Sequence, residues 1–218
     1  MTPDDKSTRD RLIDAAELLF ADQGIEATSL RDVTAKAGAN IASVNYYFQS
    51  KDGLVQAVYE RRIAPLNEER LRLLDLAERA AADRPPSLEA IVESFVEPSI
   101  RFCASHPNFM RVAGRLQFEP NLEFRSRFIM QFQEIAKRYE AALRRALPDI
   151  PVEDLFWRMH FLIGAMIHTW SNACDVELVS RGKYRFSGDA DMAKRLIDFA
   201  VAGMRAPVAK KKSTGGKG

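Results

Sequence analysis

The sequence is poor in the residues that most often carry catalysis or bind metals. It has two cysteines and three histidines among 218 residues. Cys103 and Cys174 are far apart in apolar stretches, which predicts buried, reduced thiols rather than a disulfide or a metal site. His160 and His168 lie two helical turns apart, not at the i, i+4 spacing with which one helix chelates zinc. We therefore assign no catalytic residue and no metal ligand, and we expect no cofactor.

Sequence signatures of enzymes and of membrane proteins are also missing. The chain has no G-x-S-x-G, no phosphate-binding loop and no dinucleotide fingerprint, so an enzyme is not expected. No long apolar run is free of charges, and the first residues, MTPDDKSTRD, are polar. These features argue against membrane insertion and export, and we expect a cytoplasmic protein with no membrane partner.

The net charge is small and gives no global sign of a nucleic-acid partner, since it is only +2 at pH 7. The basic tail, residues 206–218, more than accounts for this charge through Lys210, Lys211, Lys212 and Lys217. Because the tail and the polar residues 1–8 lack the apolar side chains needed to fold, both segments are predicted to be disordered. Any affinity for DNA must therefore come from a local arrangement of residues.

Helical periodicity of apolar residues runs through the rest of the chain, and no strand alternation is present. The fold class predicted is all-α, with a domain over 9–58 and a larger helical body over 59–205. Pro65 is predicted to kink the helix that joins them. The predicted helices are 8–23, 29–37, 41–47, 51–82, 87–104, 107–118, 122–147, 152–173 and 189–204, with a polar loop over 175–188.

The stretch SLRDVTAKAGANIASVNYYFQSK, residues 29–51, predicts two short helices joined by a tight turn. Ser29 can cap the first helix, and Asp32 completes an S-x-x-D capping box. Gly38 supplies the left-handed conformation that ends this helix, and Asn40 can cap the second. This is the pattern of a helix-turn-helix, in which the second helix enters the DNA major groove. The plainer alternative is a compact helical hairpin without a DNA partner.

The outer face of the second helix carries hardly any charge, as expected of a surface that approaches base edges closely. Its small side chains would lie nearest the bases, Asn45 has an amide that can pair with an adenine edge, and the two tyrosines can reach phosphates. Lys51 adds a cation at the start of the next helix, where anions are favoured. The predicted DNA-binding residues are Thr28, Ser29, Arg31, Asn40, Ala42, Ser43, Asn45, Tyr46, Tyr47 and Lys51.

Residues 9–58 resemble the DNA-binding domain of the TetR family of bacterial transcriptional regulators. The resemblance rests on AAELLFADQG at 15–24, TSLRDV at 28–33, AKAG at 35–38, YYF at 46–48 and SKDGL at 50–54. Two positions depart from the common pattern, because Asn45 replaces a tyrosine and Ile41 replaces a polar or basic residue. The resemblance implies a three-helix DNA-binding domain followed by a helical domain that dimerises and binds a small molecule.

The segment LFWRMHFLIGAMIHTW, residues 155–170, is apolar nearly all round, which predicts burial on several sides. With the last helix it can form a four-helix bundle across a twofold axis, and the resemblance implies the same pair of helices. The alternative is an ordinary core helix within one subunit. The predicted dimer face is Phe156, Met159, Ile163, Ile167, Ile197, Val201 and Met204.

The middle of the chain is rich in aromatic and flexible apolar side chains, which suit a pocket for an acyl or aromatic ligand. Each of them is individually more typical of core than of a pocket wall. LVQAVYERRIAP at 54–65 and PDIPVEDLFWRMHFLIGA at 148–165 resemble the fatty-acid-responsive PsrA-type branch, which implies a long-chain acyl effector. The predicted effector-binding residues are Phe102, Met110, Phe128, Phe132, Phe161 and His168.

Together these features predict a homodimeric transcriptional regulator, a repressor that binds a palindromic double-stranded DNA operator and is released by a small apolar effector. Two alternatives stay open. One is an architectural or division-linked DNA-binding protein of the same fold without an effector. The other is a small-molecule carrier or enzyme whose helix-turn-helix has lost DNA binding.

Overall fold

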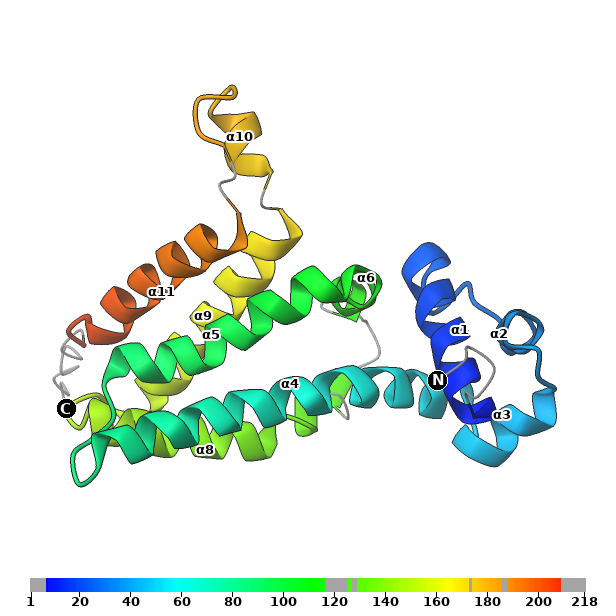
Figure 1. Cartoon of the computed structure of the whole chain (residues 1–218), viewed down its shortest axis with the longest axis horizontal. Coiled ribbons are helices and arrows are strands. Elements are labelled where there is room, and N and C mark those ends of the chain that lie inside the picture. Colours follow the sequence, from blue (N-terminus) through cyan, green and yellow to red (C-terminus); the bar gives the residue numbers. More distant parts are fainter. Residues whose placement is uncertain (1–6, 117–124, 127–128, 173, 186–187, 209–218) are drawn as a thin grey trace, which may run out of the picture.

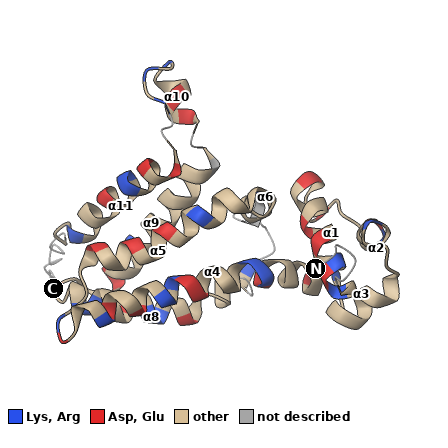
Figure 2. Cartoon of the chain, in the orientation of Figure 1, with Lys and Arg blue, Asp and Glu red and all other residues tan. Residues whose placement is uncertain are grey.

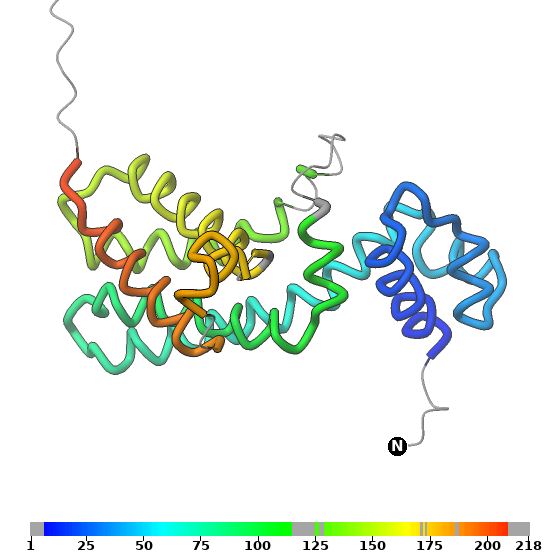
Figure 3. Tube along the Cα trace, turned by 90° about the horizontal axis from the view of Figure 1, so that it is seen from above, coloured from blue at the N-terminus to red at the C-terminus, as the bar shows by residue number. Residues whose placement is uncertain are grey.

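The longest described helix, α4 (Lys51–Ala81), joins the two parts of the chain (Figure 1). The computed structural model describes residues 7–116, 125–126, 129–172, 174–185 and 188–208. Three helices, α1 (Thr8–Gln23), α2 (Leu30–Ala37) and α3 (Ile41–Phe48), gather at the start of α4. Seen from above, these N-terminal helices lie beside one end of α4 and the body helices lie along the rest (Figure 3).

The body packs in layers on α4. Helices α5 (Leu88–Ser105) and α8 (Gln133–Ala146) lie against α4, while α9 (Val152–Ser171) and α11 (Asp189–Arg205) cover α5. Helix α6 (Pro107–Leu116) packs on α1, and α10 (Asp175–Val179) projects from the body between α9 and α11 (Figure 1). The described residues contain helices and no strand, so the all-α prediction is confirmed. Within the described ranges, no helix has both the length and the apolar content that a membrane crossing needs.

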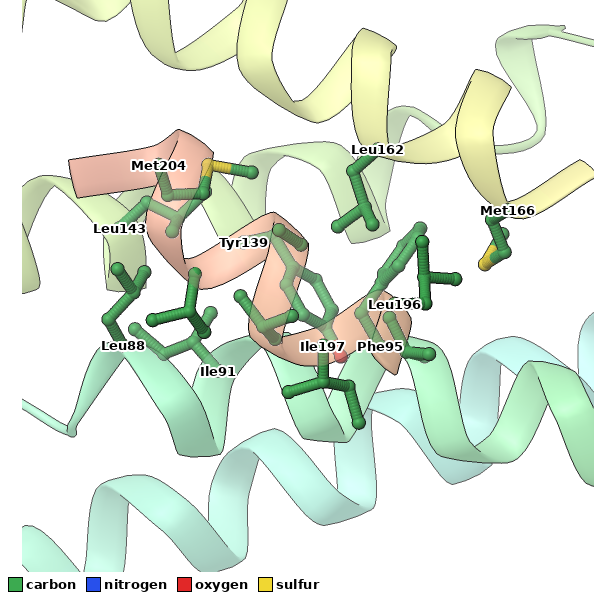
Figure 4. Close-up of a cluster of buried hydrophobic side chains, with 14 of the residues drawn as sticks. Leu88, Ile91, Phe95, Tyr139, Leu143, Leu162, Met166, Leu196, Ile197 and Met204 are labelled. Carbon is green, nitrogen blue, oxygen red and sulfur yellow. The ribbon is translucent and has the colours of Figure 1, made fainter. Parts of the chain in front are cut away.

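Two separate clusters of buried apolar side chains hold the fold together. The body core is built from α4, α5, α8, α9 and α11, and most of its large side chains are drawn in Figure 4. The N-terminal core joins α1 to α4 and reaches beyond residue 58 to Ile63 and Leu66 and into α6. The domain boundary predicted at residue 58 stays a prediction. Residues of the N-terminal core lie on both sides of this boundary. The main members of the N-terminal core are Leu12, Ile13, Phe20, Val33, Val44, Phe48, Leu54, Val58, Tyr59, Phe109 and Val112.

Both predicted disordered ends overlap described residues. Ser7 caps α1, and Thr8 is its first residue, as in the helix predicted over 8–23. Disorder in the rest of segment 1–8 stays a prediction. Residues 1–6 lie outside the described ranges. At the other end, Ala206 follows α11 directly, and the four tail lysines lie in 209–218, outside the described residues.

Two predicted elements differ from the structure. The helix predicted over 122–147 is interrupted, because residues 131 and 132 form a turn in which the amide of Phe132 donates to the carbonyl of Ile129. Residues 125–126 and 129–130 are helical, and α8 begins after the turn at Gln133. Residues 117–124 and 127–128 of that stretch lie outside the description. The polar loop predicted over 175–188 starts with α10, a single helical turn that has no buried residue. Cys174, predicted to be buried, is exposed beside it, whereas Cys103 is half-buried.

Candidate nucleic-acid interface

Helix α2 is fixed at its start by the predicted capping box. The Ser29 hydroxyl oxygen accepts from the amide of Asp32 at 3.1 Å, and the Asp32 carboxylate accepts from the amide of Ser29, also at 3.1 Å. The Ser29 hydroxyl also donates to that carboxylate at 2.6 Å. These bonds lower the pKa of Asp32, because each of them stabilises the ionised carboxylate. The first amides of α2 are therefore satisfied within the motif itself.

The turn between α2 and α3 follows the predicted chemistry. Gly38 has φ 60° and ψ 42°, a left-handed conformation that residues other than glycine rarely adopt. Asn40 then caps α3, since its side-chain oxygen accepts from the amide of Ser43 at 2.9 Å and from the Ser43 hydroxyl at 3.0 Å. Val44 and Phe48 are buried and anchor α3 to the N-terminal core. The opposite face of α3 is thus held outward.

This outward face is uncharged and strongly exposed. No Lys, Arg, Asp or Glu occurs in α3, which appears uniformly tan in Figure 2. Tyr46 is 81% exposed and its ring meets that of Tyr47 edge to face, with centroids 4.9 Å apart. Ala42 and Asn45 are exposed beside Tyr46, at the i, i+3 and i+4 positions of one helix face. Ile41, absent from the predicted contact set, is 46% exposed on the same helix.

The remaining predicted DNA-binding residues divide into surface and buried positions. Arg31 is exposed on α2, and the Lys51 ammonium donates to the carbonyl of Glu26 at 3.1 Å, which holds it against the connection before α2. Thr28 is only 1% exposed, and its hydroxyl donates to the carbonyl of Gly24 at 2.7 Å. That hydroxyl closes the turn after α1, so the predicted DNA contact of Thr28 does not fit its buried position.

A cluster of ion pairs, which sequence reasoning missed, connects α1 to α4. Glu17 on α1 is buried, at 6% exposed, and its carboxylate accepts from Arg62 Nε at 2.8 Å and from Arg62 Nη2 at 3.1 Å. Arg61 pairs with both Asp14, at 2.8 Å, and Glu17, at 3.3 Å. Nothing in the spacing of these charges marks them as partners, because they belong to two helices that meet only in the fold.

The predicted effector-binding residues fall into two groups. Phe102, Met110 and Phe132 are half-buried and each packs against the N-terminal core, and Phe132 also packs on the body core. Phe161, at 63% exposed, and His168 are exposed on α9, apart from this half-buried group, and their role in effector binding stays a prediction. Phe128 lies outside the described residues. Within those residues, no group of three His, Cys, Asp or Glu side chains is arranged to hold a metal ion.

The predicted dimer face is only partly at the surface. Ile197, Val201 and Met204 are at most 7% exposed and belong to the body core, because that face of α11 packs inward on α5 and α9. Met159, Ile163 and Ile167 are half-buried. The exposed large apolar side chains of these two helices are Phe156, which belongs to the predicted dimer face, and Trp157, Phe161 and Phe199, which do not. We call these four side chains the aromatic face.

Family models match both parts of the chain. Residues 12–58 match the model described as bacterial regulatory proteins of the tetR family. Residues 89–203, more than half of the chain, match the model described as the tetracyclin repressor-like C-terminal domain. The chain belongs to the TetR family.

Curated relatives share mainly the first part of this TetR-family chain. The transcriptional repressor KstR2 of Mycolicibacterium smegmatis is 40% identical over 52 residues, which are 24% of this chain and 25% of KstR2. The dual regulator CecR of Shigella flexneri is 36% identical over 93 residues, which are 43% of this chain and 41% of CecR. The matches thus span less than half of either relative.

Solved structures agree in fold over nearly the whole chain. The fatty acid degradation regulator FadR of Bacillus halodurans has a TM-score of 0.64 at 15% identity, with 93% of this chain and 98% of FadR covered. FadR of Bacillus subtilis, solved in complex with stearoyl-CoA, has a TM-score of 0.59 at 17% identity, with 88% and 97% covered. At these sequence identities, the similarity shows that the chains share the TetR fold.

Proposed function

We propose that this TetR-family protein is a sequence-specific transcriptional repressor that reads DNA with α3. The observation that carries the proposal is the uncharged, exposed face of α3, which a capping box, a left-handed glycine and an asparagine cap hold outward. Ala42 and Asn45 approach base edges, while Tyr46, Tyr47 and Arg31 contact phosphates on either side. Ser29, Asn40 and Ser43 orient the helices through their caps, and Lys51 contributes a cation beside them.

The active species is proposed to be a homodimer that uses the aromatic face. Trp157 stacks on Phe161 with ring centroids 5.9 Å apart, and both side chains are more than half exposed, as is Phe156. Phe199 on the neighbouring α11 is 70% exposed. Large aromatic side chains in this density are typical of a protein interface. A twofold dimer of this kind fits a palindromic operator whose half-sites are roughly 34 Å apart.

The dimer proposal is tested by one substitution and its matched control. Phe199→Asp places a charge in the proposed interface, whereas Leu76→Asp places one on an exposed apolar site of α4, at 43% exposed. Sedimentation equilibrium is expected to report a dimer for the parent protein and for Leu76→Asp, and a monomer for Phe199→Asp. A Phe199→Asp protein that remains dimeric would refute this use of the aromatic face.

The effector is proposed to be a long-chain acyl compound that binds between the two cores, against Phe102, Met110 and Phe132. Support comes from the half-buried apolar surface at this junction and from the sequence resemblance to the fatty-acid-responsive branch. Two proteins of similar fold are described as regulators of fatty acid degradation or as bound to stearoyl-CoA. Binding is proposed to favour a body geometry in which α4 moves the two N-terminal domains out of register with the half-sites.

The experiment that tests the function is a selection of genomic DNA fragments with the purified protein at near-physiological salt, followed by anisotropy titration of the enriched sequence. We expect one palindrome, released by a long-chain acyl compound. Asn45→Ala should relax base preference, while Asn108→Ala, at an exposed asparagine of α6, should not. Diffuse enrichment that no acyl compound alters would refute the repressor and support an architectural role.

A further inference from the structure

Arg70 is a buried cation at the junction of the two cores. It lies on α4 and is 4% exposed. One turn before it, Leu66 belongs to the N-terminal core, and one turn after it, Leu74 belongs to the body core. Arginine is almost never buried to this degree without a carboxylate partner.

The contacts of the Arg70 guanidinium are all uncharged. Nε donates to the carbonyl of Phe95 at 3.3 Å, Nη1 to the side-chain oxygen of Asn67 at 3.1 Å, and Nη2 to the hydroxyl of Ser99 at 2.6 Å. The guanidinium carbon lies 4.0 Å from the centre of the Phe95 ring. These bonds leave one further N–H on each terminal nitrogen. Among the described residues, no carboxylate forms an ion pair with Arg70.

No neighbouring group among the described residues supplies the missing negative charge. Burial lowers the pKa of Arg70 to about 10, which leaves it protonated at neutral pH. The two ionisable groups that act on it are the Tyr139 hydroxyl and the Cys103 thiol. Burial raises the pKa of each of these to about 12, so both are neutral under the same conditions. Within the part of the chain that the structure describes, the junction therefore holds one positive charge without a negative partner.

This charge adjoins the apolar site proposed for the effector. Cys103, which acts electrostatically on Arg70, has its sulfur 3.3 Å from the sulfur of Met110. The Phe102 ring stacks on His106, with centroids 4.4 Å apart, and meets Phe109 edge to face. Cys103 lies one helical turn after Ser99 on α5, so the guanidinium and the contact between Cys103 and Met110 are neighbours along the same face of that helix.

We propose that Arg70 anchors the head group of the effector and that this head group is a single carboxylate on a long apolar chain. The planar guanidinium presents paired N–H donors that match a carboxylate, and a buried carboxylate would neutralise the charge. One cation suits one anionic group, and the several phosphates of a coenzyme A thioester would need further cations. The inference rests on the proposed acyl effector and names the part of it that the protein recognises.

The test compares two ligands that differ only in the head group. Equilibrium dialysis with radiolabelled tetradecanoate and 1-tetradecanol measures the affinity of the full chain for each. The parent protein is expected to bind the carboxylate about tenfold more tightly, as one charge-assisted hydrogen-bonded pair provides. Arg70→Gln should lose about tenfold in tetradecanoate affinity and keep its 1-tetradecanol affinity. Arg101→Gln, at an exposed arginine of α5, should change neither affinity.

A purely structural role for Arg70 predicts a different pattern of affinities. Loss of the hydrogen bonds to Phe95 and Ser99 would then weaken the binding of both ligands equally. That result, or a carboxylate preference that persists in Arg70→Gln, would overturn the inference about Arg70. The proposal of an acyl effector would be unaffected. A parent protein that binds tetradecanoyl-CoA more tightly than tetradecanoate, independently of Arg70, would also overturn it. If the parent protein binds none of these compounds, both this inference and the proposal of an acyl effector are refuted. Should Arg70→Gln fail to fold, Arg70→Lys, which keeps the charge, is expected to retain part of the preference.

Discussion

Glu17 offers the sharpest test of how the N-terminal domain is fixed to α4. Its carboxylate accepts three hydrogen bonds from Arg61 and Arg62, at 2.8 Å, 3.1 Å and 3.3 Å. Glu17→Gln keeps the size of the side chain and removes its charge. Arg61 retains Asp14, whereas Arg62 loses its charged partner among the described residues. The substitution therefore acts mainly on the bidentate pair between Glu17 and Arg62, and also removes the longer contact with Arg61.

The expected magnitude follows from burial. Breaking a fully buried pair by removing one partner costs about 3–5 kcal/mol, because a charge is left without compensation. The side chain of Glu17 is 8% exposed, but those of Arg61 and Arg62 are 24% and 27% exposed, so water can solvate the arginines once they are released. We therefore expect Glu17→Gln to lower the free energy of unfolding by about 2–3 kcal/mol, below the fully buried limit.

A double-mutant cycle with Arg62→Gln measures the pair itself, by urea unfolding at fixed protein concentration. A coupling energy of about 2 kcal/mol is expected, and a value below about 0.5 kcal/mol would refute the reasoning from burial. The control cycle uses Glu69 and Arg72, which are 2.7 Å apart but exposed, at 36% and 56%. That cycle should give no resolvable coupling energy, although the distance between Glu69 and Arg72 is as short as that between Glu17 and Arg62.

Three further predictions concern the DNA interface, the backbone and the thiols. Lys51→Ala should weaken operator binding almost equally for all sequences and reduce the slope of log affinity against log salt by about one unit in anisotropy titrations. A change in base preference would contradict this. Gly53→Ala should destabilise the protein more than Gly38→Ala, because a Cβ at position 53 would collide with the last carbonyl of α3, whereas the space around position 38 is open. Gly38→Ala carries only the left-handed strain, about 1–2 kcal/mol, and the reverse order in urea unfolding would refute the clash. Ellman's reagent near pH 8 should modify exposed Cys174 quickly and half-buried Cys103 slowly, since burial raises the pKa of Cys103 to about 12; a Cys174→Ser protein that still reacts quickly would contradict this.

The sequence determined the local structure of the N-terminal domain almost completely. Ser29, Asp32, Gly38 and Asn40 act within a few residues of themselves, through caps and one backbone conformation. Such signals depend only on neighbours along the chain, and the structure has each of them as predicted. The uncharged face of α3 follows from the same local reading, because the buried positions Val44 and Phe48 fix its opposite side.

Tertiary structure alone decided which apolar side chains of the body are core and which are surface. In α9 nearly every face is apolar, so periodicity cannot tell Leu162 or Met166, which are buried, from Phe161, which is exposed. The sequence likewise does not reveal that Glu17 pairs with Arg62, or that Arg70 has no carboxylate partner among the described residues. Whether a charge has a partner depends on which helices meet, and residues far apart along the chain are brought together only by packing.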